Sequence, residues 1–128
     1  MILDELSELE QSCRSRFIPI IGRAKGEILH NLVLELKPKR VLELGSASGY
    51  SGIILSSGVR SVESADVKGA ELLSIDFDHV SVDEANKNFS EFGVNAKSVL
   101  AVGEDWIKDF ARQKENENSF DIIFLDFS

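Results

Sequence analysis

The sequence predicts an α/β domain with a parallel, doubly wound sheet. Short apolar strands alternate with amphipathic helices along its 128 residues, an alternation typical of right-handed βαβ units. The stretch 120–126 has a continuous apolar centre, as expected for a strand with helices on both faces. The length allows one hydrophobic core rather than two. We therefore expect a single Rossmann-like domain over residues 1–128, in which helices within residues 1–37 precede the first strand.

The elements follow from apolar spacing and from residues that cap helices. Strands are predicted at 40–44, 72–77, 97–102 and 120–126, and later helices at about 49–57, 79–92 and 105–113. Asp78 and Gly93 are expected as the N-cap and C-cap of the helix between the second and third strands. Two helical patterns precede the first strand, at 2–9 and at 26–36. Their expected core-facing residues are Ile2, Leu3, Leu6, Leu9, Ile28, Leu29, Leu32, Val33 and Leu36.

Composition narrows the class of protein. The formal net charge of −8 argues against nucleic acid as a partner, because an acidic surface repels phosphate backbones. A membrane partner is not expected, since no apolar run approaches the length of a membrane span and the acidic start lacks the basic residues of a signal peptide. Cys13 is the only cysteine and cannot form an internal disulfide, which favours a cytoplasmic location.

The turn after the first strand carries the main ligand signal. Gly45 and Gly49 remove side chains where the backbone approaches a ligand or takes a positive φ, although a tight turn without a ligand explains two glycines equally well. In a doubly wound sheet this turn lies where cofactors bind. The spacing departs from the dinucleotide pattern G-x-G-x-x-G, and Glu43 would repel a pyrophosphate. A zwitterionic amino-acid ligand suits this turn better.

A carboxylate at the end of the second strand is the expected ribose ligand. Asp76 lies 31 positions after Gly45, at a strand end where a carboxylate accepts hydrogen bonds from ribose hydroxyls. The alternative for Asp76 is a helix cap, a role that suits Asp78 better.

Several segments together resemble a known family. The stretch IIGRAKGEILHNLVLELKPKRVLELGSASGYSGIIL (20–55) is followed in order by SIDFD, AVGEDW and FDIIFLD. In this order they resemble the catechol and caffeoyl-CoA O-methyltransferase families, which use S-adenosylmethionine. The resemblance implies a class I methyltransferase fold with strand order 3-2-1-4 for the strands present, the family's C-terminal strands being missing.

The resemblance also implies site residues. For the methionine part of the cofactor they are Ile21, Glu43, Gly45, Gly49, Tyr50 and Ser51, with the Ser51 hydroxyl near the carboxylate. For the ribose and adenine they are Asp76, Phe77, Gly103, Glu104 and Asp105. Asp126 matches a carboxylate that binds Mg²⁺ in the family. Tyr50 is equally well explained as a packed aromatic, and Trp106 is expected in the core.

The implied function is S-adenosylmethionine-dependent methyl transfer to a hydroxyl of a small, aromatic acceptor. In the resembling families the general-base lysine and two further metal ligands follow the position of Asp126. The general base is therefore expected beyond Ser128, the chain is expected to end before the acceptor site, and no catalytic residue is assigned. Two alternatives stay open: an NAD(P)-binding half of an oxidoreductase, and a non-catalytic interaction module.

The stretch 58–72, between the helix after the glycine turn and the second strand, is longer than a typical connection between such elements.

The strand at 120–126 is also expected to leave an open sheet edge. An apolar edge without lysine, proline or a bulge is prone to pair with another chain. We therefore expect self-association through this strand, or pairing with a missing C-terminal segment.

Overall fold

The computed structural model describes residues 2–57 and 71–126, so Ser128 and most of the long stretch 58–72 lie outside the described residues. Four parallel strands form one sheet in the order β3-β2-β1-β4, which confirms the predicted architecture and strand order. The strands are β1 (Arg40–Leu44), β2 (Glu71–Asp76), β3 (Ala96–Leu100) and β4 (Ile122–Leu125). The helices are α1 (Ile2–Glu5), α2 (Ser7–Ser15), α3 (Gly22–Leu36), α4 (Tyr50–Ser57), α5 (His79–Phe92) and α6 (Gly103–Ala111), followed by the 3₁₀ turn η1 (Lys114–Asn116).

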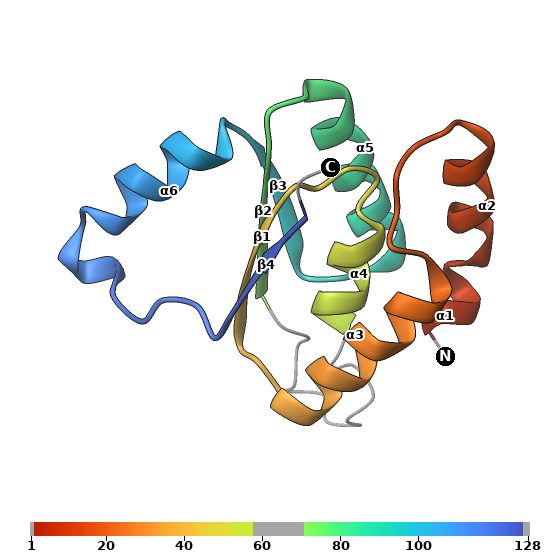
Figure 1. Ribbon diagram of the computed structural model, residues 1–128, viewed down its shortest axis with the longest axis horizontal. Coiled ribbons are helices and arrows are strands. Elements are labelled where there is room, and N and C mark those ends of the chain that lie inside the picture. The colour runs from red at the N-terminus through yellow and green to blue at the C-terminus, as the bar shows by residue number, and fades with distance from the viewer. Residues whose placement is uncertain (1, 58–70, 127–128) are drawn as a thin grey trace.

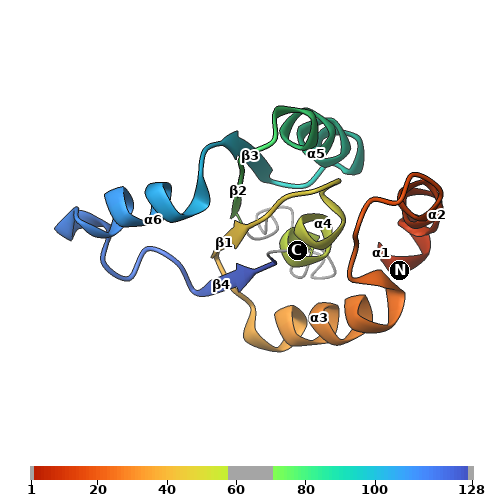
Figure 2. The ribbon, with the colours of Figure 1, turned by 45° about the horizontal axis from the view of Figure 1, so that its top comes forward.

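The helices divide unequally between the two sides of the sheet. Figure 1 and Figure 2 show α1 to α5 on one side and α6 on the other. We call these sides the covered face and the open face. The covered face carries the main core, which includes Val41, Ile53 and Phe89. The open face carries a smaller cluster around Leu42, Leu44 and Ile75, against which Trp106 of α6 packs as expected.

The N-terminal helices differ in part from the prediction. The expected helix at 2–9 is two helices that meet at Leu6, and α3 begins four residues earlier than predicted. Only one stripe of the predicted α3 face reaches the core: Leu29 and Val33 are buried. A neighbouring stripe at i, i+4 and i+8 is exposed and consists of Ile28, Leu32 and Leu36. Apolar spacing shows which side chains share a side of a helix, but not how far that side is covered.

The caps of α5 match the prediction. Asp78 has extended backbone and its carboxylate accepts a hydrogen bond from the Ser81 amide, and Gly93 ends the helix in the left-handed conformation. Asp78 therefore fixes where α5 begins, just after the carboxyl end of β2, and Gly93 fixes where it ends.

Strand register sorts the covered face into an apolar row and a polar row. Val41 of β1 is level with Leu72, Ala96 and Ile122 of the other three strands. Two residues further along, nearer the carboxyl ends, the register aligns Glu43 with Ser74, Ser98 and Phe124. Three polar side chains therefore lie side by side in a buried part of the sheet, directly beneath the turn that follows β1.

No helix among the described residues is both long enough and apolar enough to span a membrane.

Candidate functional site

The turn between β1 and α4 is shaped by its two glycines. Gly45 has φ +103°, and a Cβ atom there would clash with the carbonyl oxygen of Asp126. Gly49 has φ +89°, and a Cβ atom there would lie 3.1 Å from the Phe89 ring. Both glycines are therefore required by positive φ and by close packing of the chain against itself. This packing accounts for both glycines without a ligand, so the glycines alone do not indicate a binding site.

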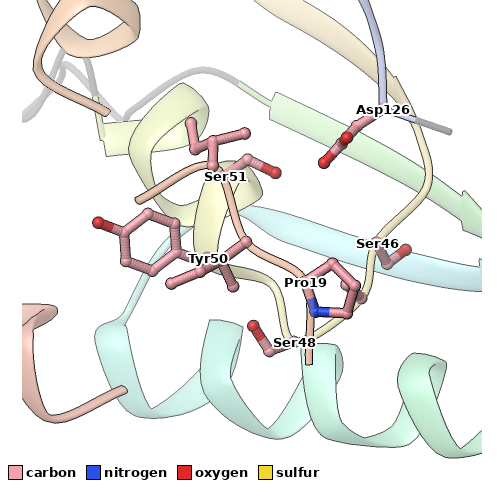
Figure 3. Close-up of a pocket in the computed structure, with 9 residues that line it drawn as sticks. Pro19, Ser46, Ser48, Tyr50, Ser51 and Asp126 are labelled. Atoms are coloured by element: carbon pink, nitrogen blue, oxygen red, sulfur yellow. The ribbon is translucent and has the colours of Figure 1, made fainter. Parts of the chain in front are cut away.

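A pocket opens beside this turn at the carboxyl ends of the strands. Its larger part has a volume of about 190 Å³ and is lined by Pro19, Ile20, Ile21, Lys25, Gly45, Ala47, Asp76 and Asp126. A smaller recess continues from it to Ser46, Ser48, Tyr50 and Ser51. Figure 3 shows this recess, with the Asp126 carboxylate on the side where Ser51 lies and the Tyr50 ring turned away from Asp126. The volume is below the roughly 300–1,000 Å³ of a complete small-molecule site, so these walls have room for only part of such a ligand.

A buried hydrogen-bonded network lies behind the turn. The Glu43 carboxylate is fully buried and accepts hydrogen bonds from Ser51 Oγ at 2.5 Å and Ser74 Oγ at 2.7 Å. Ser46 Oγ joins Ser74 Oγ at 2.5 Å and Ser98 Oγ at 2.7 Å. The network thus connects three neighbouring strands, the turn and α4, and satisfies the polar row of the covered face.

Burial raises the pKa of Glu43 from 4.5 to about 7. The hydrogen bonds from Ser51 and Ser74 lower the pKa but do not cancel the effect of desolvation, and the negative charges of Asp126 and Asp76 raise it further. Glu43 therefore changes its charge near neutral pH.

Asp76 holds the turn from the end of β2. Its Oδ2 atom accepts hydrogen bonds from the amides of Ser46 at 3.0 Å and Ala47 at 3.2 Å. Its Oδ1 atom accepts one from the Asp78 amide at 2.9 Å. The carboxylate is half-buried and lines the pocket, so it both holds the turn through hydrogen bonds and remains accessible to a ligand.

One buried hydroxyl group in the recess has no protein partner. Ser48 Oγ is buried and makes no hydrogen bond to any residue that the structure describes. A buried polar atom without a partner costs free energy unless a ligand or water satisfies it. Ser48 lies in the turn directly before α4, whose first amides favour a bound anion. The recess therefore offers an unsatisfied hydroxyl group to a polar group of a ligand or to a water molecule.

The structure brings six of the predicted residues to the pocket wall: Ile21, Gly45, Tyr50, Ser51, Asp76 and Asp126. Glu43 lies behind the wall, and Gly49 packs against α5. Tyr50 is buried in the main core, and no described residue is a hydrogen-bond partner of its hydroxyl group. Its ring therefore has the packed position that was the alternative to a ligand role.

The residues expected around an adenine do not line this pocket. Phe77 follows Asp76 and is 79% exposed. Gly103, Glu104 and Asp105 form the first turn of α6, near the end of β3, with both acidic side chains exposed. Their roles in binding the cofactor stay predictions.

Several wall residues were not singled out from the sequence. Pro19 and Ile20 extend the apolar segment before α3, and Lys25 contributes a cation from that helix. Ser46, Ala47 and Ser48 occupy the x positions of the glycine turn. Their position inside the G-x-x-x-G stretch could have indicated that they line the pocket, because each residue of such a turn lies close to the ligand.

The described residues do not form a Mg²⁺ site by themselves. Within residues 2–57 and 71–126 no group of three or more His, Cys, Asp or Glu side chains is arranged to hold a metal ion. Mg²⁺ needs several oxygen ligands in octahedral geometry, and one carboxylate at Asp126 cannot supply them. The assignment of Asp126 as a metal ligand therefore stays a prediction.

The position of the general base also stays a prediction. The base is expected beyond Ser128, and Ser128 itself lies outside the described residues, the last of which is Asp126. No residue of the pocket is therefore assigned a proton-transfer role in methyl transfer.

A glycine turn and a pocket at the carboxyl ends of a parallel sheet define a Rossmann-like ligand-binding domain. The chain belongs to the O-methyltransferase family, whose profile matches residues 1–128. It is 33% identical to catechol O-methyltransferase B of Danio rerio over 126 residues, which cover 94% of this chain and 44% of that protein. It is 28% identical to catechol O-methyltransferase of Bos taurus over 108 residues, which cover 83% of this chain and 37% of the relative.

Solved structures of methyltransferases share the fold. A Podospora anserina methyltransferase bound to S-adenosylhomocysteine aligns with TM-score 0.77 and 27% identity, over 97% of this chain and 50% of that one. The O-methyltransferase TomG of Streptomyces achromogenes, in complex with S-adenosylmethionine, aligns with TM-score 0.74 and 25% identity, over 95% of this chain and 52% of that one. The chain thus spans about half the length of these proteins, or less.

Proposed function

We propose that the chain is the cofactor-binding part of an S-adenosylmethionine-dependent O-methyltransferase. The observation that carries the proposal is the pocket itself, which combines Asp76 at the end of β2 with the glycine turn and the hydroxyl groups of Ser48 and Ser51. A nucleoside with an amino-acid tail needs these groups: a carboxylate for the ribose and small polar donors for the amino acid.

Each wall of the pocket has a separate part in this proposal. Asp76 accepts hydrogen bonds from the ribose hydroxyls, and the recess at Ser48 and Ser51 receives the carboxylate of the amino acid. Asp126 lies on the side of the recess where Ser51 lies and attracts the ammonium group. When bound, S-adenosylmethionine supplies a methyl group on a positively charged sulfur. The residues described here bind and orient that cofactor, and binding in a fixed orientation is itself a large part of catalysis of group transfer.

The acceptor proposed for the whole protein is a small hydroxylated molecule, with aromatic diols as the first candidates. This proposal is supported by the family match and by two relatives whose names specify catechol. The NAD(P)-dependent alternative is disfavoured, because the turn lacks the third glycine of the dinucleotide pattern and the matching family is one of methyltransferases.

Calorimetric titration with S-adenosylhomocysteine and, separately, with NAD⁺ tests the proposal. We expect S-adenosylhomocysteine to bind and NAD⁺ to bind more weakly or not at all. Asp76→Ala should weaken binding by roughly 1–3 kcal/mol, the scale of a hydrogen bond to a charged group. The control is Asp83→Ala, which removes an exposed carboxylate from α5 and should leave binding unchanged. Tighter binding of NAD⁺ would refute the methyltransferase assignment.

We also propose that β4 pairs with a further strand, either in a second copy of the chain or in a segment supplied in trans. Among the described residues β4 pairs only with β1, and Ile123 and Leu125 are more than half exposed. Ile123→Lys should reduce self-association measured by sedimentation, because a charged edge resists strand pairing. Val80→Lys on α5, where Val80 is also exposed, is the matched control. A monomer at tens of micromolar that Ile123→Lys leaves unaltered would exclude pairing between copies.

A further inference from the structure

The buried network around Glu43 has a direction that its hydrogens determine. A serine hydroxyl donates one hydrogen bond, and an ionised carboxylate only accepts. When Glu43 is ionised, Ser51 and Ser74 both donate to it. Ser74 must then accept from Ser46, and Ser46 must accept from Ser98. All four hydroxyl hydrogens therefore point along the network toward Glu43.

This direction determines what Ser51 can offer to the pocket. While its only hydrogen is donated to Glu43, Ser51 Oγ presents lone pairs to the recess that it lines. Lone pairs suit a cation but repel a carboxylate. A ligand carboxylate in the recess would also lie close to the buried negative charge of Glu43. The ionised network is thus mismatched to an anion at Ser51.

Protonation of Glu43 removes the mismatch at the Ser51 end of the network. A proton on Oε2 lets Glu43 donate to Ser51 Oγ, and the Ser51 hydrogen becomes free to turn into the pocket. A proton on Oε1 would instead reverse three serine bonds in succession. It would also leave the hydrogen of the buried Ser98 hydroxyl without an acceptor among the described residues. The single reversal at Ser51 is the less costly rearrangement.

We propose that binding of the cofactor carboxylate at Ser51 is coupled to uptake of one proton by Glu43. Glu43 is then a positioning residue: it does not touch the ligand, but it decides whether Ser51 accepts or donates. The proton comes from solvent, binds Oε2, and displaces the Ser51 hydrogen toward the ligand. This inference rests on the proposed function, because it assumes a ligand with a carboxylate in the recess.

The surroundings of Glu43 support the coupling. Helix α4 packs on the carboxylate through Ser51 and Gly52, and neither carries a charge. The charged groups near Glu43 are Asp76 after β2 and Asp126 after β4, and both raise its pKa. Lys25 of α3 lies across the larger part of the pocket. With a pKa of about 7 before a ligand binds, Glu43 is poised to take up a proton at neutral pH.

Calorimetry with S-adenosylhomocysteine tests the coupling without any variant. The titration is repeated at pH 8 in two buffers of different ionisation enthalpy, since the difference in heat counts the protons taken up. We expect uptake approaching one proton at pH 8 and little at pH 5.5, where Glu43 is already protonated. The dissociation constant should rise about tenfold between pH 6 and pH 8, as linkage requires for a single group with a pKa near 7. Adenosine, which lacks the amino-acid part, should bind without proton uptake.

Glu43→Gln assigns the proton to its site. The glutamine amide can donate to Ser51 and accept from Ser74 as protonated Glu43 does. The variant should therefore bind S-adenosylhomocysteine with the same affinity at pH 6 and pH 8 and without proton uptake. Binding by the wild type without uptake, or uptake that persists in Glu43→Gln or with adenosine, would overturn the coupling and leave the proposed function standing. No binding of S-adenosylhomocysteine at any pH would overturn the proposed function and, with it, the coupling.

Discussion

The covered face and the open face of the sheet bury their residues in different ways. The covered face is packed by α3, α4 and α5 and includes a polar row whose side chains are all hydrogen-bonded. The open face is apolar along β1 and β2, yet α6 covers only part of it and leaves Ile123 and Leu125 exposed. Apolar character therefore does not identify the better-packed face. The polar row, which is costly to bury, lies beneath the turn where the ligand site is.

Truncation of one apolar side chain on each face should give the largest contrast in stability. Phe89 is 1% exposed and packs against both Gly49 and Gly52, so Phe89→Ala should lower the free energy of unfolding by about 3–5 kcal/mol. Ile123→Ala on the open face should change it by no more than about 0.5 kcal/mol, because Ile123 is 55% exposed. Urea unfolding measures both values. Similar losses for the two variants would show that the open face is packed as tightly as the covered face.

A substitution in the glycine turn should destabilise the fold nearly as much as truncation of a core side chain. Gly45→Ala combines a positive φ with a Cβ atom that clashes with the Asp126 carbonyl oxygen, so we expect a loss of about 2–4 kcal/mol of unfolding free energy. Gly93→Ala is the matched control, because Gly93 also has positive φ but no atom lies within 4 Å of its Cβ position. Its loss should be about 1–2 kcal/mol. Equal losses in thermal or urea unfolding would mean that Asp126 does not approach the turn.

The buried carboxyl of the polar row should make stability depend on pH. Glu43 has a folded pKa of about 7 against an ordinary value of 4.5, so the folded protein binds the proton more tightly than the unfolded chain does. The stability that this contributes is fully present below pH 4.5 and is lost as the pH rises through 7. Between pH 5 and pH 8 the wild type should lose about 2–3 kcal/mol more than Glu43→Gln. A parallel pH dependence in the two proteins would show that Glu43 stays ionised in the fold.

The sequence predicted the sheet and the location of the site better than the roles of individual residues. Apolar runs identified the four strands, because a parallel sheet with helices on both faces needs such runs. Asp76 was located because a carboxylate at the end of the second strand has a known place in this fold. Ser74 and Ser98 gave no such signal, since a serine within a strand is uninformative until the register aligns it with Glu43. The exposed stripe of α3 was missed because spacing does not reveal what covers a helix.

Hydrogen exchange of the backbone amides, with and without S-adenosylhomocysteine, tests most directly whether the ligand site lies at the carboxyl end of the covered face. The Ser46 and Ala47 amides donate to Asp76, and the Gly45 amide donates to Ile75, so a ligand that closes on the turn should slow their exchange. We predict slower exchange in residues 45–51 and in the segment 20–25 that faces them, with none in residues 107–111 of α6, beyond its first turn. Protection confined to α6 or β4, or unchanged exchange in residues 45–51 at saturating ligand, would contradict this account.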